Sequence, residues 1–204
     1  MLAKRVFDLI VAGILLVVTL PIWIVIIMGV LVSSPGPIFY RGLRTGRHGR
    51  PFRILKFRTM RPDAERVGGG TTALNDPRVF PFGRLLRYAK LDELPQLINV
   101  LLGEMSMVGP RPELPVYTDR YTAEEREILA VPPGITDYSS IRFSSLDTIV
   151  GAQDADQNFE TNVLPEKNRL RLEYARNRTF FGDLAILALT VRCVLLKLFQ
   201  RRAS

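Results

Sequence analysis

One long apolar run dominates the hydrophobic pattern of the N-terminal part of the chain. No charged residue occurs between Leu9 and Tyr40, and the 24 residues from Leu9 to Val32 are mostly Leu, Ile and Val. As a helix this run would extend about 36 Å, enough to cross a hydrocarbon core of about 30 Å. A core helix of a small soluble domain normally keeps one polar face, and this run has none. The pattern therefore predicts a membrane-inserted helix.

A proline divides this run almost in half. Pro21 removes one helical hydrogen bond and frees the carbonyl of Val17, so we expect a kink. Inside lipid the freed carbonyl needs a donor, and the Thr19 hydroxyl is the candidate.

Basic residues flank the run on both sides. Lys4 and Arg5 precede it, and eight Lys and Arg residues without any acid lie from Arg41 to Arg61. The positive-inside rule assigns both flanks to the cytoplasm. A kinked helix that enters the membrane and returns satisfies both flanks, whereas a tilted single span satisfies one. Composition alone leaves both topologies open.

The remainder of the chain alternates short periodic segments with Gly- and Pro-rich breaks. Residues 38–41 and 52–59 have the pattern of two short strands, and the Gly-rich basic loop between them predicts a hairpin. Residues 63–78 have the composition of a loop. Helical spacing of apolar residues predicts helices at 82–102 (interrupted at Leu91-Asp92), 122–129, 166–177 and 181–199. Thr122 and Glu125 fit a capping box. We therefore predict a mostly helical α/β fold whose amphipathic C-terminal helices lie at the membrane interface.

Composition and charge limit the classes of protein. The 204 residues include 24% charged residues, too many for a polytopic membrane bundle, and 47% hydrophobic residues, too many for a disordered chain. The net charge is +8, but residues 113–173 carry −6, so the other residues carry +14. Such an excess beside a membrane segment indicates anionic lipid or a phosphate-bearing substrate. We expect no nucleic acid partner, because its motifs are missing.

The candidate chemistry lies in the segment from Lys90 to Gly103. Asp92 stands where the N-cap of a helix belongs, and Gly103 suits the end of that helix. One reading is structural: Asp92 caps the helix and Glu93 complements its dipole. The other reading is chemical, because a helix N-terminus attracts phosphate and the chain supplies many cations. These cations are Lys56, Arg58, Arg84, Arg87, Lys90 and Arg111.

An aspartate beside a bound phosphate needs a reason, because the two anions repel each other. Either a magnesium ion bridges them or the carboxylate itself attacks phosphorus. We expect the helix dipole and the nearby cations to keep Asp92 ionised, as a nucleophile requires. Adjacent helical positions point in different directions, so Asp92 and Glu93 should have separate roles.

Several ordered motifs make the chain resemble a known family. They are Lys4-Arg-Val-Phe-Asp8, Leu55-Lys-Phe-Arg-Thr-Met60, Leu91-Asp-Glu-Leu-Pro-Gln-Leu97, Gly103-Glu-Met-Ser106, Gly109-Pro-Arg-Pro112 and Pro133-Gly-Ile-Thr136. Together they resemble the bacterial sugar transferase family of monotopic phosphoglycosyl transferases. These enzymes load a sugar 1-phosphate onto a polyprenyl phosphate carrier in bacterial glycan assembly, including exopolysaccharide biosynthesis.

The resemblance implies a mechanism and a set of site residues. Asp92 would attack the β-phosphate of a UDP-sugar, release UMP and form a covalent intermediate, which polyprenyl (undecaprenyl) phosphate then attacks in a ping-pong sequence. The dyad Asp92 and Glu93 would lie close to a required Mg²⁺. Lys56, Arg87 and Arg111 would hold the phosphates, as point charge and as bidentate forks.

The resemblance also implies a location and a domain organisation. Residues 1–34 would form a re-entrant membrane helix broken at Pro21, with both ends at the cytoplasmic face of the bacterial inner membrane. Residues 35–204 would form the compact cytoplasmic catalytic domain, with the small β-hairpin and the interfacial C-terminal helices.

Three departures from the family pattern limit what can be carried over. Leu20 replaces the frequent Ser or Thr before the helix-breaking proline. The segment Asp137–Ile141 replaces a glycine and a Gln-Val segment, and Arg171 replaces a common acidic residue. Because the last two regions would help to form the nucleotide or sugar pocket, the resemblance does not identify the sugar. The alternative function is a non-catalytic, membrane-anchored basic protein that binds anionic lipid or recruits glycan-assembly enzymes.

Overall fold

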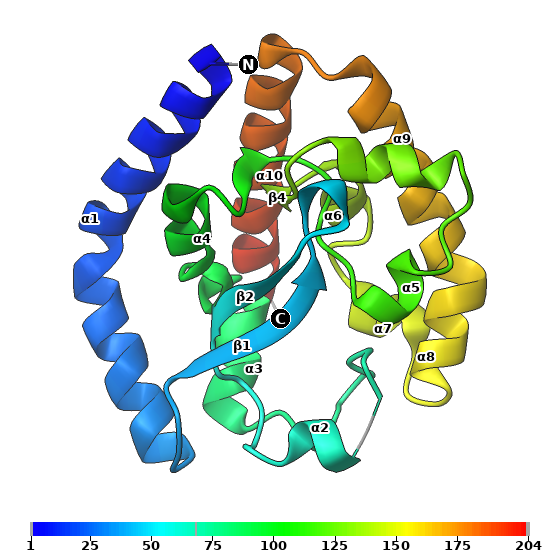
Figure 1. The fold of residues 1–204 in the computed structure, drawn as a ribbon. Helices are drawn as coiled ribbons and strands as arrows, with labels where there is room; N and C mark the ends of the chain where they lie inside the picture. Colours follow the sequence, from blue (N-terminus) through cyan, green and yellow to red (C-terminus); the bar gives the residue numbers. More distant parts are fainter. Residues whose placement is uncertain (1, 68, 203–204) are drawn as a thin grey trace.

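The computed structural model describes residues 2–67 and 69–202, which form mainly helices with two small sheets (Figure 1). The elements are α1 (Leu2–Ser33), β1 (Phe39–Thr45), β2 (Pro51–Phe57), α2 (Ala64–Val67), α3 (Pro81–Tyr88), α4 (Gln96–Leu102), β3 (Ser106–Val108), α5 (Pro115–Thr118), β4 (Gly134–Thr136), α6 (Tyr138–Arg142), α7 (Leu146–Val150), α8 (Ala155–Asn158), α9 (Leu164–Asn177) and α10 (Phe180–Arg202). Short 3₁₀ turns occupy Arg47–Gly49, Leu91–Glu93 and Glu125–Ala130, and a π turn occupies Phe159–Val163. The prediction of a mostly helical fold with a small hairpin is confirmed.

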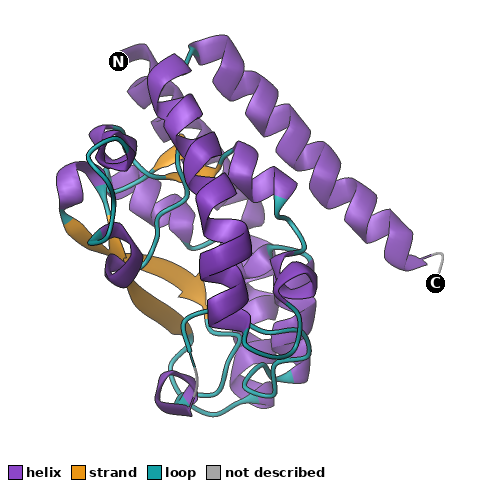
Figure 2. Cartoon of the chain, turned by 90° about the vertical axis from the view of Figure 1, so that its right-hand side faces the viewer, coloured by secondary structure: helices purple, strands orange, loops and turns teal. Residues whose placement is uncertain are grey.

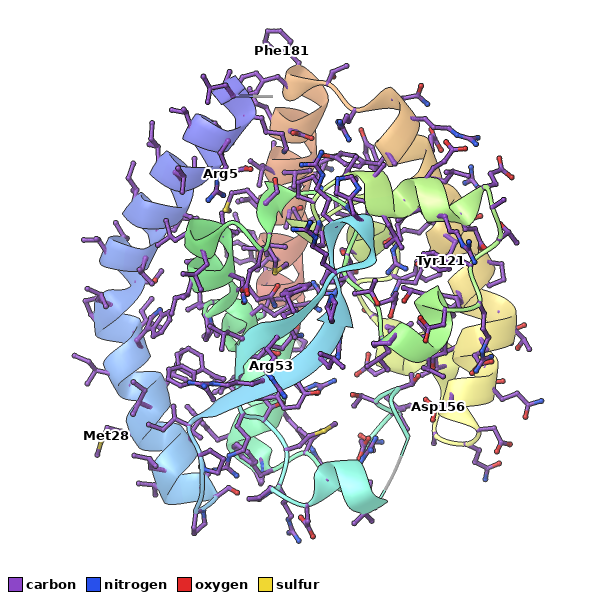
Figure 3. The ribbon with its side chains drawn as sticks, viewed as in Figure 1. Arg5, Met28, Arg53, Tyr121, Asp156 and Phe181 are labelled. Atoms are coloured by element: carbon purple, nitrogen blue, oxygen red, sulfur yellow. The ribbon has the colours of Figure 1, made fainter. Side chains whose placement is uncertain are left out.

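Helix α1 lies along one side of the domain for its whole length and bends near its middle (Figure 1). Its inner face is buried at Ala12, Trp23, Ile26 and Val30, in the two apolar clusters that also include residues of β2, α3 and α4. Its outer face is apolar and exposed, and Met28 projects from it away from the domain (Figure 3). By length and composition, α1 is the one helix among the described residues that could cross a membrane.

The N-terminal turns of α1 are bonded to the centre of the domain. The buried Asp8 carboxylate accepts hydrogen bonds from Ser106 Oγ (2.7 Å) and from the Met107 backbone N–H (3.2 Å) at the start of β3. Arg5 points inward from α1 (Figure 3) and donates to the carbonyls of Val100 (2.7 Å) and Leu101 (3.2 Å). A cation at the C-terminal end of α4 satisfies free carbonyls and complements the helix dipole. The first helix is therefore an integral element of the fold.

Thr19 does not perform the predicted role at the kink. Its hydroxyl donates to the carbonyls of Leu15 (2.7 Å) and Leu16 (3.4 Å) and accepts from Trp23 Nε1 (3.2 Å). The prediction that Thr19 bonds to the freed carbonyl of Val17 was wrong, because a helical Thr hydroxyl reaches carbonyls three and four residues earlier.

The hairpin is antiparallel, with Phe39 opposite Phe57 and Thr45 opposite Pro51. Strand β1 is longer than predicted, since Gly42 pairs with Ile54 and the turn begins only at Gly46. Asn99 of α4 fixes β2 by accepting from the Leu55 N–H (2.9 Å) and donating to the Arg53 carbonyl (2.9 Å). This side chain holds β2 in register against α4 beside Lys56.

The segment from residue 82 to 103 contains two helices, and the predicted interruption at Leu91-Asp92 is confirmed. The start of the second helix differs from the prediction: α4 begins at Gln96 with Pro95 as its N-cap residue, and Asp92 lies inside the preceding 3₁₀ turn. Lys90 precedes this turn in the left-handed conformation (φ 58°). Asp92 is therefore not the N-cap residue of α4, and the prediction that it caps this helix is wrong.

The C-terminal half lies beside the hairpin, on the side away from α1, and behind it (Figures 1 and 2). Parallel pairing of β3 with β4 brings Gly134 beside Ser106, and the Thr122–Glu125 capping box is confirmed by reciprocal bonds of 2.9 and 3.1 Å. Helix α9 buries Lys167 and Arg171 inside the domain, and α10 runs behind the hairpin as the last element (Figures 1 and 2). Phe181 projects outward at the start of α10 (Figure 3).

Gly83 of α3 lies so close to the Thr59 backbone that a side chain at residue 83 would disturb the packing of α3. A Cβ at Gly83 would lie within 3.0 Å of the Thr59 backbone carbonyl, whereas a Cβ at Gly13 of α1 meets nothing within 4 Å. We expect Gly83→Ala to destabilise the domain by about 1–3 kcal/mol, a fall in Tm of about 2–10 °C. Gly13→Ala is the matched control and should not lower Tm, because alanine favours a helix by up to about 1 kcal/mol. Thermal melts in detergent measure both, and an equal Tm for the two variants would contradict the packing.

Candidate active site

The five polar side chains predicted from the sequence line one cavity of about 780 Å³. Lys56 comes from β2, Arg87 from α3, Asp92 and Glu93 from the turn before α4, and Arg111 from the loop after β3. The cavity is also lined by Leu15 and Thr19 of α1 and by residues of α6, α7 and α10. Elements distant in sequence therefore assemble one polar site beside the first helix.

Asp92 lines this cavity and is almost fully buried, with 5% of its surface exposed. Its Oδ2 is 4.0 Å from Lys56 Nζ, and its buried Oδ1 has no hydrogen-bond partner among the described residues. Burial raises the pKa of this carboxyl, and the charges of Lys56, Arg87 and Lys90 oppose that rise. Asp92 lies in the 3₁₀ turn that precedes α4, four residues before the first residue of α4. An unsatisfied buried carboxylate oxygen is costly, which indicates that a ligand completes it.

Glu93, unlike Asp92, is surrounded by cations that bond to its carboxylate and favour the ionised form. Its carboxylate forms a two-point ion pair with Arg111, of which one bond (Arg111 Nη1 to Glu93 Oε2) is 3.0 Å, and it accepts from Lys56 Nζ at 3.2 Å. Burial alone would raise its pKa, but Arg111 and Lys56 hold that pKa well below the usual range. The two adjacent carboxyls are thus shifted in opposite directions, the arrangement expected of groups with separate roles.

Lys56 lies between the two carboxylates. Burial lowers its pKa from 10.5 to about 8, against the raising effect of Glu93, and Arg111 and Arg87 lower it further. The ammonium therefore loses its proton near the physiological range. Because burial disfavours the charged form of Lys56, an additional anion bound beside it would stabilise the ammonium.

Several hydrogen bonds fix the position of Arg111. Besides Glu93, its Nη1 donates to the Ile135 carbonyl (3.0 Å), and its backbone N–H donates to Asp137 Oδ2 (3.1 Å). Asp137 in turn caps α6 by accepting from the Ser140 N–H at 2.6 Å. The fork of the guanidinium is thereby oriented by β4 and by the start of α6.

Two of the three departures from the family pattern, Arg171 and the segment that begins at Asp137, lie side by side. Arg171 is fully buried, donates to Glu113 Oε1 (2.7 Å) and places its Nε 3.7 Å from Asp137 Oδ2. Lys167, one helical turn earlier, lies 3.4 Å from the same Glu113 oxygen. An arginine in α9 and an aspartate at residue 137 therefore complement each other directly behind Arg111.

The other basic candidates divide into two groups. Arg87 lines the cavity and donates to Thr72 Oγ1 (2.5 Å), and Arg84 and Lys90 line it as exposed residues. Arg58 lies elsewhere: it is buried and donates to Ser34 Oγ (2.7 Å), to the Ser34 carbonyl and to the Pro37 carbonyl (2.5 Å). Arg58 therefore fixes the end of α1, and its inclusion among the phosphate-binding cations was wrong.

The donor set fits a magnesium ion that is shared with a substrate. Mg²⁺ commonly binds one or two carboxylates and completes its shell with water and substrate phosphates. Asp92 offers a buried oxygen without a partner, while both oxygens of Glu93 are engaged by Arg111 and Lys56. No group of three or more His, Cys, Asp or Glu residues in the described part of the chain could hold a metal. Asp92 therefore fits this ion as it stands. Glu93 could bind the ion only after one of its oxygens released Arg111 or Lys56.

Sequence reasoning did not identify Glu113, Lys167 and Lys197, which also line the cavity. Lys167 is buried between Glu113 and the Phe159 ring (4.9 Å to its centroid), and burial lowers its pKa to about 8. A lysine within an amphipathic helix, or within the apolar run that forms α10, has the pattern of an ordinary surface residue. No signal in a single sequence distinguishes these cations.

The pKa of Lys56 gives the site a pH dependence with a definite sign. Above about pH 8 the ligand-free protein loses the Lys56 charge, so the affinity for an anionic donor should fall as pH rises. We expect a falling alkaline limb near pH 8 in kcat/KM for the donor. The Lys56→Arg variant should keep some activity, and its kcat/KM should not fall near pH 8, because arginine stays protonated. Lys167 has a similar pKa, so Lys167→Arg is the control; loss of the limb there would contradict the assignment.

Comparison with known proteins identifies relatives of the chain. A family model described as "Bacterial sugar transferase" matches residues 1–197. "Uncharacterized sugar transferase EpsL" of Bacillus subtilis is 40% identical over 195 residues, covering 96% of this chain and 88% of that protein. A UDP-glucose:undecaprenyl-phosphate glucose-1-phosphate transferase of Caulobacter vibrioides is 34% identical, covering 95% and 70%. A putative undecaprenyl-phosphate N-acetylgalactosaminyl 1-phosphate transferase of Bacillus subtilis is 45% identical, covering 59% and 68%.

Proposed function

Because the chain belongs to the bacterial sugar transferase family, we propose that it transfers a sugar 1-phosphate from a UDP-sugar to polyprenyl phosphate and releases UMP. The observation that carries this proposal is the buried Asp92 carboxylate, with one unpartnered oxygen, in a cavity lined by Lys56, Arg87 and Arg111. The relatives include transferases named for glucose and for N-acetylgalactosamine, so the sugar is left unassigned.

In the first half-reaction an Asp92 oxygen attacks the β-phosphorus of the UDP-sugar. The new bond is the Asp92 O–P bond, the broken bond joins the β-phosphorus to the bridging oxygen, and UMP leaves with that electron pair. The attacking form is the carboxylate, and the cations around Asp92 favour this form against the effect of burial. Lys56 and Arg111 stabilise the charge that spreads over the phosphoryl oxygens.

In the second half-reaction an oxygen of polyprenyl phosphate attacks the same phosphorus. The Asp92 O–P bond breaks, the carboxylate is regenerated, and the product is a polyprenyl diphosphate sugar. No proton transfer is required when both nucleophiles are ionised. Glu93 serves as a positioning residue, because it holds Lys56 and Arg111 in place through their ion pairs.

We further propose Mg²⁺ as the cofactor, held by Asp92 with Glu93 nearby. When bound, this ion would neutralise charge on the diphosphate of the donor. Arg111 and Lys56 remain the protein groups that fix the phosphates, and removal of Mg²⁺ with EDTA should reduce UMP release and be reversed by added Mg²⁺.

The same proposal places α1 in the cytoplasmic membrane as a re-entrant helix. Buried residues from Asp8 to Val30 pack on the domain, so both halves of α1 lie beside it. A straight span would carry one half away from a cytoplasmic domain, which favours the re-entrant topology. Cysteines introduced at Leu2 and Ser33 in a Cys193→Ser background should both react with reagents from the cytoplasmic side. Labelling of either one from the periplasmic side would overturn this topology.

The proposed reaction is tested with the full chain in detergent, using UDP-glucose and UDP-N-acetylgalactosamine, Mg²⁺ and undecaprenyl phosphate. We expect UMP release with a matching UDP-sugar, and a covalent mass adduct when the lipid is omitted. A wider set of UDP-sugars follows if neither probe reacts. Membrane or lipid binding without UMP release from any UDP-sugar would instead support the non-catalytic alternative.

A further inference from the structure

A second group of cations lines the cavity on the side of α10. Helix α10 contributes Thr190, Cys193, Val194 and Lys197 to the wall, and Lys90 contributes from the turn before Asp92. The connection between α3 and α10 is direct, because the Tyr88 hydroxyl donates to the Lys197 carbonyl. The hydrogen bonds of Glu93 among the described residues come from Lys56 and Arg111 and not from this side of the cavity.

Lys56 and Arg111 form ion pairs with Glu93, but the lysines on the α10 side of the cavity have no such acidic partner among the described residues. Lys197 Nζ donates to the Ser144 carbonyl at 2.6 Å, and within the described residues neither Lys197 nor Lys90 forms an ion pair. Burial lowers the pKa of Lys197 and the charge of Lys90 lowers it further, while Asp147 acts in the opposite direction. The charge of Lys90 also acts on Asp92. Lys90 and Lys197 line the same cavity as Asp92, so an anion bound by both lysines would reduce their mutual repulsion.

The cavity that these two lysines line extends to the first helix. Leu15 of α1 lines the cavity and is 38% exposed, so the cavity reaches the face of α1 that we place in the membrane. Over the same stretch α10 exposes Val191, Leu195, Leu196 and Phe199. A phosphate attached to a long hydrocarbon chain matches this combination, because its head needs cations and its tail needs apolar surface.

We propose that Lys90 and Lys197 bind the phosphate of the polyprenyl acceptor, with its hydrocarbon chain lying between α10 and α1. This assignment rests on the proposed function and names the acceptor side of the same cavity. The acceptor enters after UMP has left, so both substrates never need to occupy the cavity together. Lys56 and Arg111 serve the donor, and α10 serves as the wall that receives the lipid.

The test uses the full chain in mixed micelles and separates the two half-reactions. For Lys197→Ala we expect the rate of adduct formation with UDP-sugar alone to stay within about 2-fold of the unmodified protein, and KM for undecaprenyl phosphate to rise about 10-fold or more. Such a rise corresponds to about 1.4 kcal/mol of lost binding. Lys197→Arg should restore most of the affinity. Arg192→Ala is the matched control, because Arg192 is an exposed cation of α10 that does not line the cavity.

Each other outcome overturns the proposal. An unchanged KM would remove Lys197 from the acceptor site, and a parallel loss of adduct formation would make it a cation for the donor. A KM effect that follows reduced binding to phosphatidylglycerol vesicles would assign Lys197 to phospholipid headgroups. A fall in Tm shared by Lys197→Ala and Lys197→Arg, together with the KM effect, would make its role structural. Absence of an adduct in the unmodified protein with every UDP-sugar would overturn the proposed function itself.

Discussion

Asp92→Asn is expected to abolish both UMP release and the covalent adduct, with a loss of at least about 10⁴-fold, as for removal of other covalent nucleophiles. The amide has nearly the shape of the carboxylate but cannot form the Asp92 O–P bond as an anionic nucleophile. Because the carboxylate is buried with an unpartnered oxygen, its neutral replacement should leave Tm unchanged or raised. Loss of activity together with retained stability is the signature of a catalytic role.

Mass spectrometry after incubation with UDP-sugar alone gives the most direct measurement. The unmodified protein should gain the mass of a sugar phosphate, and Asp92→Asn should not. Asp119→Asn is the matched control, since Asp119 is exposed and does not line the cavity. Turnover by Asp92→Asn at more than a trace level would overturn the assignment of the nucleophile.

Arg111→Met is expected to have the second largest effect. It removes both points of the ion pair with Glu93 and leaves that half-buried carboxylate with Lys56 alone. We expect kcat/KM for the donor to fall about 100- to 1,000-fold, because a phosphate fork and the position of Glu93 are lost together. Breaking this partly exposed pair should also cost about 1–3 kcal/mol of stability. Arg111→Lys should recover little activity, because lysine cannot form the two-point contact.

A double-mutant cycle separates these two effects. Arg111→Met combined with Glu93→Gln removes the uncompensated charge, so much of the lost stability should return. Activity should not return, because the phosphate contact stays absent. If stability and activity recover together, the loss in Arg111→Met came from distortion of the domain rather than from a missing phosphate contact.

The sequence predicted those features that depend on local pattern. The apolar run predicts α1, the two alternating segments predict the hairpin, and the spacing of Thr122 and Glu125 predicts the capping box; the structure contains all three. The start of α4 was mispredicted because aspartate is a preferred N-cap residue and Asp92 stands at a suitable position. The left-handed conformation of Lys90 before the 3₁₀ turn could not be predicted either, because this conformation favours glycine.

The geometry of the site could not be predicted from periodicity. Lys56, Glu93 and Arg111 meet across separations of 37 and 18 residues, and no local rule relates such positions. The motif resemblance named these residues, but their contacts became visible only in the structure. The pairing of Asp137 with Arg171 is of the same kind, since each residue departs from the family pattern separately and the two explain each other only when seen together.

The anchoring of α1 to the domain has a practical consequence for anyone who wants a soluble enzyme. Deleting the helix would remove Arg5 from the end of α4 and Asp8 from the start of β3, and would strip the apolar clusters of Trp23 and its neighbours. The deletion product should therefore aggregate. A better route to solubility keeps the inner face of α1 and redesigns its outer face, beginning with the widely exposed Val17, Val18, Ile24 and Val25.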